Sequence, residues 1–284
     1  MSTIGTFNYP GGKTTIASWI IQYLPDHEVY VEPFGGSAGV LANKPESPLE
    51  VYNDTASLCV DFFRAVKHKP DELQHWVQTT PYSRELFDEY TETLQQDPPE
   101  DLVERAGMFW YTQFTSFAGK GVICGGGGLT FSIQCSASDG KNRQRDLMSS
   151  ADKMELVCER FRKVQIENLD FATVFEKYDS RDTVFYCDPP YVNVGDNYYQ
   201  TEEGGFDHAR FVESLQELDG YWLVSYDHNI PKGLEDYYMV TRGKRSTMDH
   251  EKEEKTETLI MNYDQNHTPM FKHSDQLTIG QLTP

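Results

Sequence analysis

The stretch Thr183-Val184-Phe185-Tyr186-Cys187-Asp188-Pro189-Pro190-Tyr191 decides the fold. Its first half is a β-branched and aromatic run without polar alternation, which is typical of a strand buried on both faces of a sheet. The two prolines end the strand, because neither offers an N–H to a neighbouring strand. Open α/β sheets bind ligands at the carboxyl ends of their strands, so the residues after this strand are predicted to line a binding site.

The four residues Asp188-Pro189-Pro190-Tyr191 combine a carboxylate, a proline carbonyl and an aromatic face. These groups suit a planar molecule that carries an NH₂ group, since the carboxylate and the carbonyl accept its two hydrogens while the ring stacks on its face. An ordinary strand-to-loop turn with a surface tyrosine is the alternative. We favour the binding site, because all four residues follow an apolar strand.

This tetrapeptide resembles the catalytic motif of amino-methyltransferases that act on exocyclic amines, in the form typical of adenine-specific DNA enzymes. The whole chain from Thr6 to Tyr263 is similar to the Dam-like group, in which the cofactor motif precedes the catalytic one. The resemblance implies methyl transfer from S-adenosylmethionine (SAM) to the exocyclic amine of a flipped-out adenine in double-stranded DNA. It implies a catalytic role for four residues: Asp188, Pro189, Pro190 and Tyr191.

Tyr9-Pro10-Gly11-Gly12-Lys13 precedes a helix predicted over Thr14–Leu24, with one of its first two threonines as the cap. Backbone N–H groups and the lysine would then converge on a carboxylate. A phosphate-binding P-loop is excluded by spacing, because it needs glycine at position 7, where the chain has Phe7. A mere turn is the alternative. By the resemblance, the segment contacts SAM through Tyr9, Gly11, Gly12 and Lys13.

Residues 29–40, VYVEPFGGSAGV, predict a strand, a glycine-rich turn and a short helix to about Asn43. This chain departs from the family pattern Phe-x-Gly-x-Gly at the last position, where it has Ala38 in place of glycine and Gly39 directly after it. We expect Gly39 to take over the turn. Close packing of a helix on a strand is the alternative role for these glycines. By the resemblance, the segment contacts SAM through Glu32, Phe34 and Gly36.

Two further strands are predicted to end in carboxylates. The strand Leu49–Asn53 leads to Asp54, which at this position can accept both ribose hydroxyls of an adenosyl group. The strand Val164–Asn168 leads to Asp170, which by the resemblance accepts a hydrogen bond from the adenine amine of SAM. Each aspartate has the same alternative, which is to cap the helix that follows it.

From Thr55 to about Arg162 the alternation of strands and helices stops, and apolar stripes at helical spacing predict a helical lobe with an aromatic core. The fold class is therefore α/β, a Rossmann-like methyltransferase sheet with an inserted, mainly helical target-recognition lobe. The predicted division is a catalytic domain of residues 1–58 and 151–264, an inserted domain of residues 59–150, and a tail of residues 265–284.

In the Dam-like group the insertion reads the DNA sequence. Candidate DNA contacts here are Ser83-Arg84 and the stretch Gln113–Lys120. A glycine-rich loop and a basic segment follow, and a solvated surface loop is the alternative for both. The basic residues among these candidates are Arg84, Lys120, Lys141, Arg143 and Arg145.

Beyond the lobe, the pattern predicts a helix over Ala151–Lys163 and closing strands over Tyr237–Arg242 and Glu257–Tyr263. The polar stretch Asn193–Gly205 is expected to form a lid over the flipped base. His228 and its neighbour Asn229 are expected in a turn.

The charge balance is unusual for a DNA-binding protein. The chain has 25 Lys and Arg against 45 Asp and Glu, which gives a net charge of −20, whereas DNA binding needs a basic surface. The basic residues are either concentrated on one face, or the protein comes from a halophilic host or its virus, where salt screens repulsion; we favour the second.

Other features of the composition set limits on location and partners. The sequence shows no apolar run of about 18 residues and no signal peptide, so a soluble, cytoplasmic protein is expected. Its five cysteines are odd in number and lack C-x-x-C spacing, so neither disulfides nor a zinc site is expected. We expect no metal, no membrane partner and a monomer.

Two alternative functions remain open. One is methyl transfer to another amine, that of cytosine, of RNA adenine or of a glutamine amide, although the aspartate at 188 speaks against cytosine. The other is a SAM-binding or DNA-binding protein without turnover, which the departure at Ala38 favours.

Overall fold

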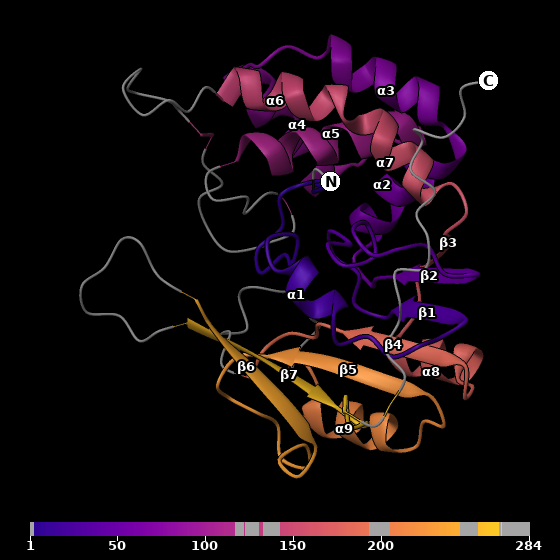
Figure 1. The fold of residues 1–284 in the computed structure, drawn as a ribbon. Helices are drawn as coiled ribbons and strands as arrows, with labels where there is room; N and C mark the ends of the chain where they lie inside the picture. The colour runs from indigo at the N-terminus through magenta and orange to yellow at the C-terminus, as the bar shows by residue number, and fades with distance from the viewer. Residues whose placement is uncertain are drawn as a thin grey trace, which may run out of the picture.

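A seven-stranded sheet forms the centre of the fold (Figure 1). The structure is a computed structural model that describes residues 3–116, 122, 131–132, 143–192, 205–244, 255–266 and 268. Its strand order is β3-β2-β1-β4-β5-β7-β6, in which β7 alone runs antiparallel to its neighbours β5 and β6. The strands are β1 Val29–Glu32, β2 Leu49–Asn53, β3 Gln165–Glu167, β4 Thr183–Cys187, β5 Tyr221–Tyr226, β6 Tyr238–Lys244 and β7 Lys255–Met261. The expected α/β class is confirmed.

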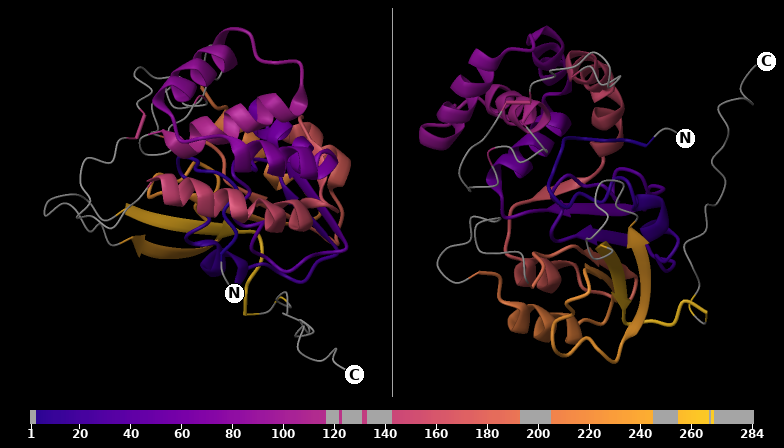
Figure 2. Two further views of the ribbon diagram at one scale, coloured as in Figure 1. Left: turned by 90° about the horizontal axis from the view of Figure 1, so that it is seen from above. Right: turned by 90° about the vertical axis from the view of Figure 1, so that its left-hand side faces the viewer.

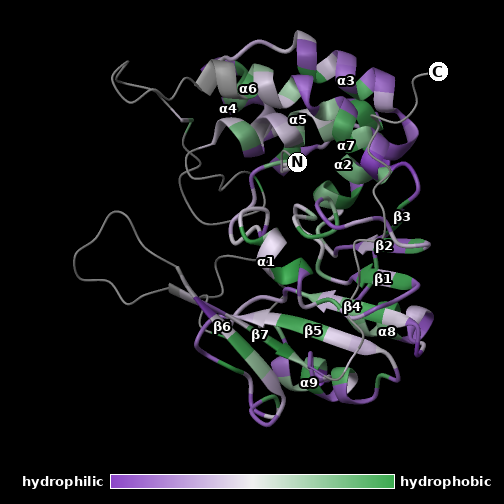
Figure 3. Cartoon of the chain, viewed as in Figure 1, coloured by the Kyte–Doolittle hydropathy of each residue, from purple (hydrophilic) through white to green (hydrophobic). Residues whose placement is uncertain are grey.

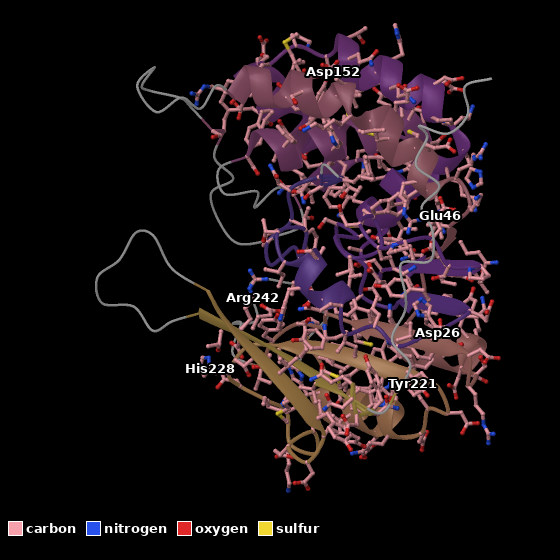
Figure 4. The ribbon with its side chains drawn as sticks, in the orientation of Figure 1. Asp26, Glu46, Asp152, Tyr221, His228 and Arg242 are labelled. Atoms are coloured by element: carbon pink, nitrogen blue, oxygen red, sulfur yellow. The ribbon has the colours of Figure 1, made fainter. Side chains whose placement is uncertain are left out.

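The order of the strands reverses between β1 and β4, which lie side by side in the middle of the sheet. All five residues of β4 are buried, as its continuous apolar run predicts. Figure 4 labels Asp26 and Tyr221 at the end of the sheet where β1 and β5 begin, and His228 at the opposite end, beyond β5. A ligand site is expected at that second end, where the parallel strands terminate.

The sheet has a hydrophobic core on each face. Along β4, Val184 and Tyr186 belong to one core, while Phe185 and Cys187 belong to the other, because side chains alternate across a strand. Helices α8 (Phe171–Tyr178) and α9 (His208–Gln216) cover the second face; in Figure 1, α8 is seen beside β4 and α9 below β5. Helix α1 (Ala17–Ile21) packs on the first face.

In the described part of the chain, six helices separate β2 from β3 and form the helical lobe, which stands above the sheet in Figure 1 and in the right-hand view of Figure 2. Figure 3 shows hydrophobic colour along β5 and hydrophilic colour on the outer helix α3. The predicted stripes face inward, so the expectation that the aromatic residues form core is confirmed. The helices are α2 Ser57–His68, α3 Pro70–Thr79, α4 Arg84–Gln96, α5 Leu102–Thr115, α6 Arg143–Asp152 and α7 Met154–Phe161.

The core of the helical lobe is continuous with the core on the first face of the sheet. Phe63 of α2 stacks on Phe161 of α7 with ring centroids 4.5 Å apart, and it contacts Tyr52 of β2 at 4.3 Å. Phe7 touches the same cluster, with Phe109 of α5 at 5.1 Å. The rings therefore join the N-terminal segment, the sheet and the lobe in one packed unit.

A buried ion cluster also ties the lobe to the sheet. Glu50 of β2 accepts from Lys44 Nζ at 2.5 Å and from Arg160 of α7 at 2.6 and 2.9 Å. Arg160 also donates to the carbonyl of Leu41, in the chain that follows β1. Burial of these charges is offset by their mutual pairing, so loss of one partner would leave the others uncompensated.

Two predicted helices near the N-terminus are wrong in extent. Helix α1 covers only Ala17–Ile21, and no side chain caps it, so neither Thr14 nor Thr15 has that role. After the glycine turn the chain forms turns up to residue 43 instead of a helix. Asn43 explains part of this difference, because its amide donates to the carbonyls of Gly39 and Ile4 and so fixes the chain in a local, non-helical path.

Other predicted boundaries differ by smaller amounts. The helix expected over Ala151–Lys163 is instead the pair α6 and α7, and α6 begins at Arg143, in a segment expected to be a loop. The closing strands are confirmed, with ends shifted by one or two residues. The lid stretch lies outside the described residues except for Gly205 and the tail except for residues 265, 266 and 268. No helix in the described ranges is long and apolar enough to cross a membrane.

Candidate active site

A cavity of about 550 Å³ opens where β1, β2 and β4 end. Its volume lies in the range of small-molecule sites. Every residue predicted to be catalytic or to bind the cofactor lines it, with Asp170 as the exception. These lining residues are Tyr9, Gly11, Gly12, Lys13, Glu32, Phe34, Gly36, Asp54, Asp188, Pro189, Pro190 and Tyr191.

In the glycine-rich turn, Ala38 adopts the left-handed backbone conformation, with φ +52°. The expectation that Gly39 takes over this conformation is wrong. Gly39 is needed for another reason, since a Cβ there would lie 2.6 Å from the backbone nitrogen of Thr14. At Gly36, which has φ +47°, a Cβ would meet the Tyr9 ring at 3.1 Å. The turn and the N-terminal segment are therefore in close contact over the cavity.

Glu32, at the end of β1, is a buried carboxylate in the cavity wall. Its Oε1 accepts from the Tyr30 hydroxyl and from the Leu41 amide, both at 2.7 Å. Oε2 accepts no hydrogen bond within the described part of the chain. Burial raises the pKa of Glu32 to about 8, against which its two hydrogen bonds act. A bound cation would favour the ionised form.

Asp54, which follows β2, is held by two backbone amides, while α2 itself has Ala56 at its N-cap and no side-chain cap. Its Oδ2 accepts from the Gly36 amide at 2.7 Å, and its Oδ1 accepts from the Ala56 amide at 2.8 Å, just before α2. Burial raises the pKa of Asp54, while these backbone hydrogen bonds lower it. Each carboxylate oxygen has a second lone pair, so Asp54 can also accept from a pair of ligand hydroxyls.

Asp188 is held by Lys13, whose ammonium lies 2.6 Å from both carboxylate oxygens. Lys13 is almost completely buried, and it also donates to the carbonyl of Gly11 at 3.0 Å. A second carboxylate, Glu257, lies 3.5 Å from the same ammonium. Burial raises the pKa of Asp188, Lys13 lowers it and Glu257 raises it. Two carboxylates thus share one buried cation.

Tyr191 completes this group. Its hydroxyl donates to Glu257 Oε1 at 2.6 Å, and its ring lies 5.2 Å from the Lys13 ammonium. The Tyr191 ring centroid is also 5.7 Å from that of Tyr226, whose hydroxyl contacts Nδ1 of His208 at 3.1 Å. Sequence reasoning missed Glu257, because an acid in a polar closing strand looks like a solvated residue. Its burial on β7 is what distinguishes it.

Asp170 lies away from this cavity, at a neighbouring one of about 870 Å³. It is exposed, its side chain caps α8 by accepting from Ala172 N at 3.0 Å, and it forms an ion pair with Arg210. The capping alternative is therefore observed. The second cavity shares Tyr9, Phe34, Asp54 and Pro190 with the first, so the two are continuous.

The candidate DNA contacts are only partly within the described residues. Arg84 is exposed in the first turn of α4, where Ser83 is the cap, and its guanidinium lies 5.4 Å from the Phe131 ring. Gln113 is fully buried in α5. Lys120 and Lys141 lie outside the described residues, and so do the side chains of two residues of α6, Arg143 and Arg145.

The two cavities fit SAM. Asp54 suits a ribose diol, Glu32 has one oxygen available for an ammonium group, and Phe34 offers an aromatic wall at the junction of the cavities. Asp188, at the end of the neighbouring strand, faces the same space. In the part of the chain that the structure describes, no three His, Cys, Asp or Glu residues are grouped to hold a metal ion.

Comparison with known proteins agrees with this geometry. The family model described as D12 class N6 adenine-specific DNA methyltransferase matches residues 9–262. This range includes the residues that line both cavities, and it includes the helical lobe. Comparison with curated protein sequences gives no match. The sheet with one antiparallel strand is consistent with the Rossmann-like methyltransferase fold of that family. The match covers most of the chain, and the protein belongs to the D12 class of N6 adenine-specific DNA methyltransferases.

Proposed function

We propose that this SAM-dependent DNA adenine methyltransferase carries out methyl transfer in the cavity at the ends of β1 and β4. The observation that carries the proposal is the position of Asp188, a partly buried carboxylate that opens into the same cavity as Glu32, Gly36 and Asp54. When bound, SAM supplies a methyl group activated by a positively charged sulfur. The residues of the chain bind, orient and hold the amine that accepts it.

In this proposal, Asp188 and the carbonyl of Pro189 accept the two hydrogens of the adenine amine. That amine is a poor nucleophile because its lone pair is delocalised into the ring. Two acceptors favour a more tetrahedral nitrogen and aim its lone pair at the methyl group. Pro190 stiffens the segment, and Asp188 need not be a strong base, because the amine becomes acidic once it is methylated.

Tyr191 offers its ring to the target base. An adenine leaves the duplex at a cost of a few kcal/mol, and stacking on an aromatic ring returns about 1–3 kcal/mol per base. The hydrogen bond to Glu257 at 2.6 Å supports this role, because it fixes the edge of the ring without covering its face. Base flipping is thus assisted by a ring that is already oriented.

Lys13 supports the role of Asp188 by keeping it ionised. The ammonium contacts both oxygens at 2.6 Å, and each oxygen retains a second lone pair for the adenine amine. Glu257 lies 3.5 Å from Lys13 and offers it a second anion when the base arrives. Lys13 then shares its charge between the two carboxylates.

The cofactor would lie across the two cavities. We assign its ammonium group to Glu32, its ribose to Asp54, and its adenine to the region of Phe34 and Asp170. Asp170 would have to release part of its ion pair with Arg210 for this contact. The full set of proposed cofactor residues is Tyr9, Gly11, Gly12, Lys13, Glu32, Phe34, Gly36, Asp54, Asp170 and Asp188.

We further propose that residues 59–150 recognise the DNA target, and that residues 1–58 and 151–264 form the catalytic unit. Arg84 is the proposed contact whose exposed side chain supports this role. The other proposed basic contacts are Lys120, Lys141, Arg143 and Arg145. We also propose that the enzyme works as a monomer inside the cell, where its DNA substrate is.

The test uses the purified protein, SAM labelled in its methyl group, and mixed-sequence duplex DNA without methylated bases. The assay is run at low and at molar salt, because the chain carries a net charge of −20. Nucleosides from the digested DNA are then separated. N6-methyladenine is the expected product, and an optimum at molar salt would support a halophilic origin, whereas an optimum near ~50 mM would exclude it.

Parallel reactions with RNA and with protein fractions test the alternative acceptors. Asp188→Ala is the matched variant, expected to keep the fold and DNA binding and to lose methyl transfer. Retained activity in Asp188→Ala would refute the role of Asp188. Label in cytosine, in RNA or in protein but not in DNA adenine would refute the proposed use of the cavity.

A further inference from the structure

Arg242 of β6 lies directly opposite Glu257 of β7 in the sheet. Residues opposite each other in an antiparallel pair have Cα atoms about 4.5–5.5 Å apart and point to the same face. Glu257 accepts from Tyr191 and lies beside Lys13. Arg242 is therefore paired across the strands with a residue of the proposed active-site cluster. Figure 4 labels Arg242 close to α1.

The side chain of Arg242 is exposed, and within the described ranges its guanidinium has no ion pair. No carboxylate of the described residues forms an ion pair with it, although the chain has 45 acidic residues. Five other arginines of the described ranges do pair with acids, namely Arg64, Arg105, Arg160, Arg162 and Arg210. Glu257, the acid across from it, is already engaged by Tyr191. An anion from outside the chain would therefore displace no partner of Arg242 among the described residues.

An aromatic ring supports this arginine. The guanidinium carbon of Arg242 is 5.8 Å from the ring centroid of Trp19 in α1, a cation–π distance. Such a contact orients the planar guanidinium and leaves its charge available, whereas a carboxylate would neutralise it. Helix α1 follows the segment that carries Lys13, so the contact between Arg242 and Trp19 joins the edge strand β6 to the helix after that segment.

We propose that Arg242 binds a backbone phosphate of the DNA strand that carries the target adenine. Arginine binds phosphate through two parallel hydrogen bonds, and such contacts fix the register of a protein on DNA. A base that leaves the duplex to reach Asp188 brings its own sugar and phosphates toward the same cluster. The proposal rests on the proposed function for the location of the reacting base, and it adds a phosphate site on the edge of the sheet, away from the helical lobe.

The test compares Arg242→Ala with Arg181→Ala. Arg181 is also exposed and without an ion pair in the described residues, but it precedes β4 and so lies at the opposite end of the sheet. The two variants lose the same charge. The dissociation constant of a short mixed-sequence duplex, labelled with a fluorophore, is measured by anisotropy over a range of salt concentrations.

Loss of one phosphate contact reduces the slope of log K against log salt by about 0.9. We expect this change for Arg242→Ala and no change for Arg181→Ala. Equivalently, the ratio of wild-type to Arg242→Ala affinity should shrink about eightfold for each tenfold rise in salt. Arg242→Lys keeps a point charge and should retain most of the slope. Thermal unfolding and SAM affinity of each variant report on the fold.

Equal slopes for wild type and Arg242→Ala would overturn the proposal, and so would equal changes in Arg242→Ala and Arg181→Ala. Methyl transfer by the wild type is measured in the same preparation. A changed slope together with no methyladenine would leave the phosphate site in place and refute the proposed function. The two proposals therefore fail in different assays.

Discussion

The hydroxyl of Tyr191 donates a hydrogen bond to Oε1 of Glu257 at 2.6 Å, across 66 positions of sequence. Glu257 is buried on β7, the antiparallel strand next to β5. The bond links the segment after β4 to β7, which is two strands away in the sheet. It also brings a second carboxylate within 3.5 Å of the lysine that holds Asp188.

Removal of this hydrogen bond should slow methyl transfer. A hydrogen bond to a charged group contributes about 1.5–3 kcal/mol, which corresponds to a loss of about 10-fold to 100-fold in kcat/KM. We expect this loss in Tyr191→Phe, which keeps the ring, and in Glu257→Ala. If Glu257 acts through the tyrosine hydroxyl, the kcat/KM of the double variant should be only slightly lower than that of the less active single variant. Steady-state kinetics on the identified DNA site measure all four proteins, and multiplied losses would contradict the coupling.

Replacement of Lys13 by methionine should move the pH profile. Lys13 lowers the pKa of Asp188, so its loss raises that pKa further. Asp188 must be ionised to accept from the amine, and the acid limb of kcat/KM should therefore shift to higher pH. Lys13→Arg keeps the charge and is expected to leave the limb near its wild-type position. An unchanged limb in Lys13→Met would show that another group controls it.

Glu32 should make the protein less stable as pH rises. Its pKa is raised to about 8 by burial, above its ordinary value of 4.5, so the folded state binds a proton that the unfolded state has lost between these two values. The free energy of unfolding should fall over this interval, and the fall should be smaller in Glu32→Gln. Urea unfolding across the interval measures both. Glu46→Gln, at the exposed residue labelled in Figure 4, is the control, expected to keep the wild-type slope.

Ala38→Gly should stabilise the protein modestly. Ala38 has φ +52°, a conformation that costs an L-residue about 1–2 kcal/mol, while glycine loses about 0.5–1 kcal/mol of backbone entropy on folding. The expected net gain lies between zero and about 1.5 kcal/mol. Gly36→Ala, at φ +47° and 3.1 Å from the Tyr9 ring, should destabilise. Chemical denaturation gives both values, and a less stable Ala38→Gly would mean that the buried methyl packing outweighs the strain.

The sequence predicted those parts of the fold that depend on local pattern. The run before Asp188 predicted β4, since five consecutive buried side chains need an apolar segment. The stripe through Phe62 and Phe63 predicted α2 in the same way. The short α1 was overestimated, because its apolar spacing continues into residues that form turns.

Contacts between segments that are distant in the sequence could not be predicted from local pattern. The contact between Lys13 and Asp188 joins residues 175 positions apart, and the lysine was assigned to the cofactor alone. Glu257 gave no local sign of its role, because the residue pattern of the closing strand β7 does not reveal which of its polar side chains faces a buried partner. Ala38 was misjudged for the opposite reason, since backbone conformation there is imposed by packing around the turn and overrides the preference of the residue.

The continuity of the aromatic core has a consequence for how the protein melts. Phe63 shares its neighbours between α7 and the strand β2, so separation of the helical lobe from the sheet would expose rings on both sides. The buried residues of the lobe and those on the first face of the sheet belong to one cluster, so neither part can lose its packing without exposing the other. In a calorimeter the helices and the sheet should therefore absorb heat in one transition.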